Sequence, residues 1–119
     1  MQSDKYEFFI AGVQFHQAKT IINDLSPDDE LDMVEEPSNK FDPNAVALLY
    51  NEVMLGYVPA KFSASVTAFL ETADNPVCIL KKVDPKAKTY EQLFVKIYDI
   101  GLEAFEDETM DYDEDDEEA

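Results

Sequence analysis

Two short apolar runs joined by only two residues constrain the fold of this chain more than any other feature. The runs cover residues 45–50 and 53–58, and Asn51-Glu52 separates them. A two-residue connection between such runs is typical of an antiparallel β-hairpin. Asn51 favours this interpretation because asparagine tolerates the positive φ that tight hairpin turns require. The sequence therefore predicts a hairpin here.

Other segments also have the composition of strands. Residues 6–16 are rich in aromatic and β-branched residues and predict a first strand. Gly12, inside that segment, indicates a bulge or a close backbone approach. Further strands are expected at residues 31–35, 77–83 and 91–100, the last two as a second hairpin around residues 84–88.

The apolar spacing changes after Pro59. Phe62, Val66, Phe69 and Leu70 follow one another at helical intervals and predict a helix from Pro59 to about Thr72. A short helical turn is expected at residues 19–25. Short strands that close on themselves with one long helix indicate a mainly β fold, a small OB-like or SH3-like β-barrel.

The charge is strongly acidic and uneven. The 119 residues carry a formal net charge of -18, and none of them is arginine. Residues 103–119 hold eleven of the acids and no lysine, whereas the first 102 residues carry sixteen acids against nine lysines. We therefore expect one folded domain at residues 1–102 and a disordered acidic tail at residues 103–119.

Most catalytic classes lack their motifs in this chain. It has no glycine-rich phosphate loop, no histidine pair for zinc and no Ser, His and Asp set. The single histidine, His16, is expected to be structural or ligand-lining, and Cys78 to be a small buried hydrophobe. We expect no enzymatic activity, no cofactor and no metal. With no apolar run of membrane-spanning length, a soluble cytoplasmic protein is expected.

A polar loop with one aromatic residue precedes the first run of the hairpin. Residues 36–44 read EPSNKFDPN, and such loops commonly present a surface to a ligand. Turn chemistry offers another interpretation, because Asn39, Asp42 and Asn44 are residues that turns prefer. Phe41 would then plug the barrel.

Three motifs together resemble the HIRAN domain, a small β-barrel found alone or attached to DNA-repair helicases and translocases. They are EPSNKFDPNAVAL at residues 36–48, AGVQFH at residues 11–16 and LGYVPA at residues 55–60, and the resemblance spans residues 8–100. It implies binding of single-stranded DNA, especially a 3′ end, and recognition of stalled forks or damaged DNA. The DNA-binding residues it implies are Gln14, Phe15, Asn39, Phe41, Asp42, Tyr57 and Lys61.

The implied roles follow from side-chain chemistry. Phe15, Phe41 and Tyr57 can stack on splayed bases. Asn39 and Asp42 could recognise a base edge or a terminal sugar hydroxyl. The chain departs from the family pattern twice, because Gln14 stands where DNA-binding members tend to carry a basic residue and the expected lysine falls one position late, at Lys61.

A second class of function fits the acidity. An acidic protein can bind a basic protein, either as an adaptor or as a DNA mimic that inhibits a nucleic-acid enzyme, because runs of carboxylates imitate the phosphates of DNA. Lys81, Lys82, Lys86 and Lys88 form the one basic cluster in the sequence. This cluster is a solvated face, a docking point for the acidic tail, or a phosphate track.

Overall fold

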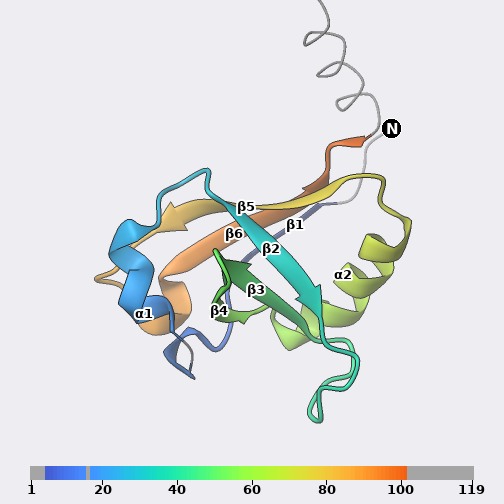
Figure 1. The fold of residues 1–119 in the computed structure, drawn as a ribbon, viewed down its shortest axis with the longest axis horizontal. Helices are drawn as coiled ribbons and strands as arrows, with labels where there is room; N and C mark the ends of the chain where they lie inside the picture. The colour runs from blue at the N-terminus through green and yellow to red at the C-terminus, as the bar shows by residue number, and fades with distance from the viewer. Residues whose placement is uncertain (1–4, 16, 102–119) are drawn as a thin grey trace, which may run out of the picture.

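The computed structural model describes residues 5–15 and 17–101. In this part of the chain six strands form one antiparallel sheet that curls into a half-barrel (Figure 1). From edge to edge the strands are β1 (Lys5–Phe9), β6 (Leu93–Asp99), β5 (Pro76–Val83), β2 (Glu30–Glu35), β3 (Val46–Tyr50) and β4 (Val53–Tyr57). The expectation of a mainly β fold built as a small barrel is confirmed.

The two edges of the sheet meet just beyond β1. Ala11 and Tyr57 exchange two backbone hydrogen bonds, with N–O distances of 2.9 Å in both directions. This single bridge joins the chain after β1 to β4 and brings the curled sheet close to a closed barrel. Gly56 permits the approach, because a Cβ at this position would collide with the backbone oxygen of Ala11 and lie 2.6 Å from Cγ2 of Ile10.

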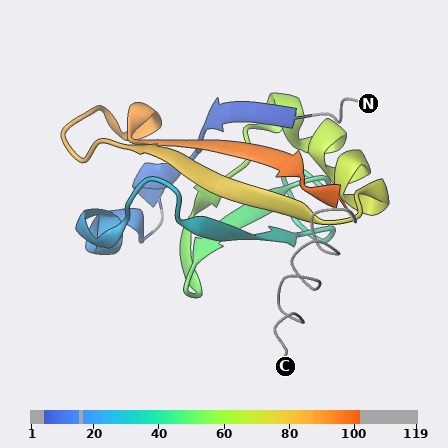
Figure 2. The same ribbon diagram turned by 90° about the horizontal axis from the view of Figure 1, so that it is seen from above.

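One long helix, α2 (Ala60–Thr72), packs against the inner side of β1. Figure 2 shows it at the upper right, next to β1. Val66 is fully buried, and the ring of Phe62 stacks on that of Phe8 with centroids 5.6 Å apart. Phe69 makes an edge contact of 5.7 Å with Tyr6. The predicted helix is therefore confirmed, and its apolar stripe packs on the core as expected.

The two-residue turn also forms as predicted. Asn51 and Glu52 both have positive φ, 47° and 70°, between β3 and β4. Such a turn matches the right-handed twist of the strands on either side. The second hairpin, β5 with β6, is paired over its whole length, with a bulge at Lys81.

The first strand is shorter than predicted. β1 ends at Phe9, and residues Val13–Phe15 form a 3₁₀ turn, η1, in place of further strand. Gly12, with φ of 72°, turns the chain away from the extended conformation after the Ala11 bridge. The remaining short helices are α1 (Ala18–Ile21), η2 (Ile22–Asp24) and η3 (Thr89–Glu91), of which the first two match the expected helical turn.

Some expectations concern positions outside the described residues. These are the role of His16 and the structure of residues 103–119, including the boundary between domain and tail. Within residues 5–15 and 17–101, no helix is long and apolar enough to cross a membrane.

Candidate functional site

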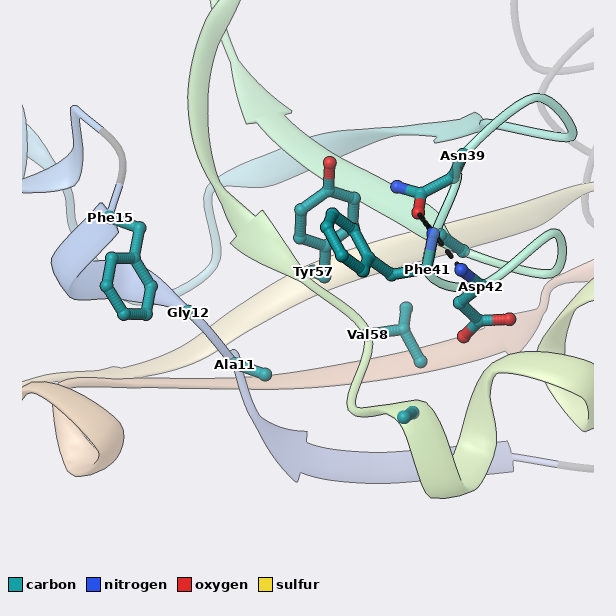
Figure 3. Close-up of a pocket in the computed structure, with 10 residues that line it drawn as sticks. Ala11, Gly12, Phe15, Asn39, Phe41, Asp42, Tyr57 and Val58 are labelled. Atoms are coloured by element: carbon teal, nitrogen blue, oxygen red, sulfur yellow. Dashed lines mark hydrogen bonds between the residues drawn. The ribbon is translucent and has the colours of Figure 1, made fainter.

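A pocket of about 820 Å³ lies beside the bridge that brings the two sheet edges together (Figure 3). Three parts of the chain line it: residues 11, 12 and 15 after β1, the loop between β2 and β3, and residues 57, 58 and 60 at the end of β4 and the start of α2. The pocket therefore depends on barrel closure, because the bridge between Ala11 and Tyr57 holds the first and third parts together.

Asn39 organises the loop between β2 and β3. Its Oδ1 accepts hydrogen bonds from the backbone N–H groups of Phe41 and Asp42, at 2.8 and 3.0 Å. Its Nδ2 donates to Oε1 of Glu36 at 3.0 Å. Asn39 thus has the turn-forming role that asparagine commonly takes in such loops, and it fixes the backbone on which Phe41 is presented.

Asp42 is held between the loop and the helix. Its Oδ1 accepts the backbone N–H of Asn44 at 2.9 Å, and its Oδ2 accepts the hydroxyl of Ser63 at 2.7 Å. Ser63 is a buried polar side chain, 3% exposed, in the first turn of α2. Each carboxylate oxygen has two lone pairs, so these two hydrogen bonds leave Asp42 with acceptor capacity toward a ligand.

Tyr57 is fixed from the same loop. Its hydroxyl donates to Oε1 of Glu36 at 2.8 Å, the oxygen that also receives the Asn39 amide. This hydrogen bond, then partial burial and the charge of Glu36, raise the pKa of Tyr57, and the hydrogen bond from Asn39 partly offsets the effect. The phenol therefore stays protonated and hydrogen-bonded at neutral pH.

Two exposed aromatic residues from different segments line the pocket. Phe41 is 96% exposed on the loop, and Phe15 is 78% exposed in η1. Figure 3 shows Phe15 on one side of the pocket and Asn39 on the other, with the Phe41 ring overlapping that of Tyr57 in this view. The alternative in which Phe41 plugs the barrel is wrong, because its side chain is almost wholly in solvent.

The structure brings five of the seven expected site residues to this pocket: Phe15, Asn39, Phe41, Asp42 and Tyr57. Gln14 is exposed in η1 but does not line it. Lys61 is exposed on α2, with Nζ 5.3 Å from the ring centroid of Phe62, and does not line it either. None of the described lining residues is basic.

Two residues that support the candidate site, Glu36 and Ser63, were not predicted from the sequence. Both support the site by hydrogen bonds that cross 21 residues of sequence. Ser63 did carry a signal, since it lies three residues before Val66 and so on the inward face of the predicted helix, where a hydroxyl needs a partner.

The described part of the chain has no cluster of side chains suited to a metal centre. No group of three or more histidine, cysteine or acidic side chains there could hold a metal ion. The chemistry that the pocket offers is an apolar, aromatic surface with one carboxylate and one amide at its rim.

Comparison with known proteins finds a family model that matches most of the chain. The family model of the HIRAN domain matches residues 3–98. No curated protein is significantly similar in sequence.

Two solved structures share the architecture. A protein from Lactobacillus plantarum is similar with a TM-score of 0.65 and 14% identity, over 82% of this chain and 99% of the other. The HIRAN domain of human HLTF is similar with a TM-score of 0.58 and 11% identity, over 92% of this chain and 88% of the other. At such identities the likeness establishes the fold, an OB-like curled sheet.

Proposed function

The chain belongs to the HIRAN domain family, and from this membership we propose that it binds the 3′ end of single-stranded DNA as a non-catalytic module of DNA repair or replication. HIRAN domains are nucleic-acid-binding modules. The proposal adds to this the kind of nucleic acid, the position on the strand and the process.

The observation that carries the proposal is the pair of exposed phenylalanines at the pocket. Phe41 and Phe15, 96% and 78% exposed, leave apolar rings in water beside an apolar hollow of about 820 Å³. Unpaired bases stack on such rings, with about 1–3 kcal/mol per base. The stacking requires bases that are not already paired, which favours a single strand over a duplex.

The rim of the pocket supports recognition of an end. A carboxylate can accept a hydrogen bond from a free 3′-hydroxyl, which an internal phosphodiester lacks, and Asp42 has acceptor capacity for it. A 3′-phosphate would instead place a negative charge beside a negative carboxylate. Because no described lining residue is basic, binding would depend on bases and the terminal hydroxyl more than on phosphates.

The test is fluorescence anisotropy with a 5′-labelled single strand that ends in a 3′-hydroxyl or, in the second arm, a 3′-phosphate. We expect tighter binding of the hydroxyl form, and loss of that preference in Asp42→Asn. This variant keeps an oxygen for the Asn44 N–H, and Ser63 can turn its proton to the carbonyl of Ala60, 3.0 Å away. The loop should therefore persist.

Asp74→Asn is the matched control. Asp74 is exposed just after the far end of α2, and this substitution removes the same charge without touching the pocket. Its preference for the 3′-hydroxyl should equal that of the native chain. Equal affinity of the native chain for both strand ends would contradict end recognition, and no binding of either strand would contradict the whole proposal.

One observation favours a second candidate, an acidic protein that binds a basic partner as an adaptor or a DNA mimic. Seven acids within residues 111–118 give that run a charge density like that of one strand of a nucleic-acid backbone. Under this alternative, oligonucleotides do not bind with or without residues 103–119, and deletion of the segment abolishes binding of the partner. If the segment instead masks a DNA site, its deletion raises the affinity for oligonucleotides.

A further inference from the structure

The solvent side of β1, β6 and β5 carries three lysines and three aromatic rings, and Glu7, Val77 and Ile79 lie among them. We call this surface the outer face, and it is defined by Lys5, Phe9, Lys82, Phe94, Lys96 and Tyr98. These residues alternate along their strands with Phe8, Val95 and Ile97, which are buried in the core. The outer face is thus the opposite side of the sheet from the one that α2 and the core occupy (Figure 2).

Strand register brings these side chains together. Phe9, Phe94 and Lys82 form one row across the three strands, and the Phe9 and Phe94 rings meet edge to face at 4.9 Å. Nζ of Lys82 lies 5.9 Å from the centroid of Phe9, and Nζ of Lys96 lies 4.9 Å from that of Tyr98. The rings therefore hold two ammonium groups on one surface.

The outer face is cationic on a chain that is acidic overall. It has three lysines, whereas the acid among the outward residues of β1 is Glu7, opposite Lys96. The neighbouring Lys81 does not belong to it, since Lys81 is the bulge residue and forms an ion pair with Asp28 at 3.6 Å. A surface of this kind attracts a carboxylate-rich peptide that also has apolar side chains.

Such a peptide follows β6 in the same chain. Residues 103–119, the acidic segment, contain eleven acids together with Phe105, Met110 and Tyr112. β6 ends at Asp99, so the acidic segment begins four residues beyond the last strand of the outer face. At about 3.3 Å per residue its 17 residues can extend about 55 Å, whereas the seven residues of β6 span only about 23 Å.

We propose that the acidic segment, residues 103–119, docks on the outer face through Lys5, Lys82 and Lys96. Attachment to the same chain gives the segment an effective concentration in the millimolar range, so weak contacts suffice. This inference does not depend on the proposed DNA binding.

The experiment places a nitroxide spin label on the segment of the full-length chain. Thr109→Cys provides the attachment, and Cys78 does not compete because it is buried and its pKa is raised to about 12. Amide signals of β5 and β6 near Lys82 and Lys96 should lose at least half of their intensity at low salt. They should recover in 1 M NaCl, where the Debye length is about 3 Å.

Two double variants test the lysines. Lys82→Gln with Lys96→Gln should restore the signals, whereas Lys19→Gln with Lys40→Gln, which removes the same charge from exposed positions elsewhere, should leave the loss intact. The salt arm uses native lysines, so the test stands even if the first variant folds poorly. Signal loss around Phe41 and Ala60, or no loss on the outer face, would overturn the proposal.

Isotope mixing distinguishes docking within one chain from docking between two copies of the chain. Spin-labelled chain without ¹⁵N is added to ¹⁵N-labelled chain without the spin label. If the segment docks within its own chain, this mixture shows no signal loss. Loss in the mixture equal to that in the single chain would mean docking between molecules and would also overturn the proposal.

Discussion

The hydroxyl of Ser63 donates a hydrogen bond of 2.7 Å to Oδ2 of Asp42, and this contact ties the first turn of α2 to the loop between β2 and β3. The same loop is tied to β4 by the Tyr57 hydroxyl through Glu36. The loop that presents Phe41 is therefore anchored from two sides, by side chains distant in sequence. A preformed site loses less conformational freedom when it binds a ligand.

Ser63→Ala tests the first anchor. The substitution removes the donor from a part-buried carboxylate, so we expect the free energy of unfolding to fall by about 1–3 kcal/mol. Urea denaturation measures the change. Ser65→Ala is the matched control on the exposed side of α2 and should lie within about 0.5 kcal/mol of the native chain. Equal values for the two variants would show that the contact contributes nothing to stability.

Gly56→Ala tests the closure of the barrel. The added methyl group would meet the Ala11 backbone, which cannot move without loss of the bridge to Tyr57, so we expect a cost of about 3 kcal/mol. Gly101→Ala is the control, because Gly101 has φ of 77° but open space around its Cβ position. Conformational strain alone should cost it about 1–2 kcal/mol. If thermal unfolding showed a smaller loss of stability for Gly56→Ala than for Gly101→Ala, the close approach at Gly56 would not limit the fold.

Phe41→Ala separates binding from stability. The ring is 96% exposed, so its removal should change the free energy of unfolding by less than about 0.5 kcal/mol. Loss of one stacked base should weaken binding of a single strand by about 1–3 kcal/mol, or roughly 5- to 150-fold. Tyr90→Ala removes an aromatic that is 57% exposed and does not line the pocket, and its affinity should be unchanged. If anisotropy titrations showed that Phe41→Ala and Tyr90→Ala lose the same affinity for the single strand, the contact of Phe41 with DNA would be nonspecific.

Local signals in the sequence were enough for the hairpin, the helix and the fold class. The Asn51-Glu52 turn and the spacing of Phe62, Val66 and Phe69 act over a few residues, and both elements formed as expected. The predicted first strand was wrong beyond Phe9, because the chain there makes only the isolated bridge from Ala11 to Tyr57 and then turns at Gly12. The glycine was visible in the sequence, whereas the pairing of Ala11 with a residue 46 positions away was not.

For the candidate site too, the expectations that rest on one local motif agree best with the structure. Asn39, Phe41 and Asp42 lie in one short motif, and the structure brings them to the pocket as expected. Gln14 and Lys61 were expected there from the resemblance to the HIRAN domain, and neither lines the pocket: Gln14 is exposed in η1 and Lys61 is exposed on α2. Contacts between distant segments decided these positions.

Asp99 should make the free energy of unfolding depend on pH. The backbone N–H groups of Asp74, Asn75 and Gly101 lower its pKa from the ordinary 3.8, and burial opposes this only in part. The unfolded chain therefore binds a proton more readily, so this contribution is complete above about pH 4 and is lost as the pH falls through the lowered pKa. Asp99→Asn should destabilise the protein more at pH 7 than at pH 3, as measured by urea denaturation. An equal effect at both values would contradict this origin.

Cys78 should react only when the fold opens. Burial, and secondarily the charge of Glu30, raise the pKa of its thiol to about 12, and its side chain is fully inaccessible between β2 and β6. The reactive thiolate is thus both scarce and shielded. An aromatic disulfide reagent should label the native protein far more slowly than the protein in urea, and Gly56→Ala should accelerate native labelling by the fold-change that its loss of stability predicts. Rapid labelling of the native chain would contradict the buried position of β5 in the sheet.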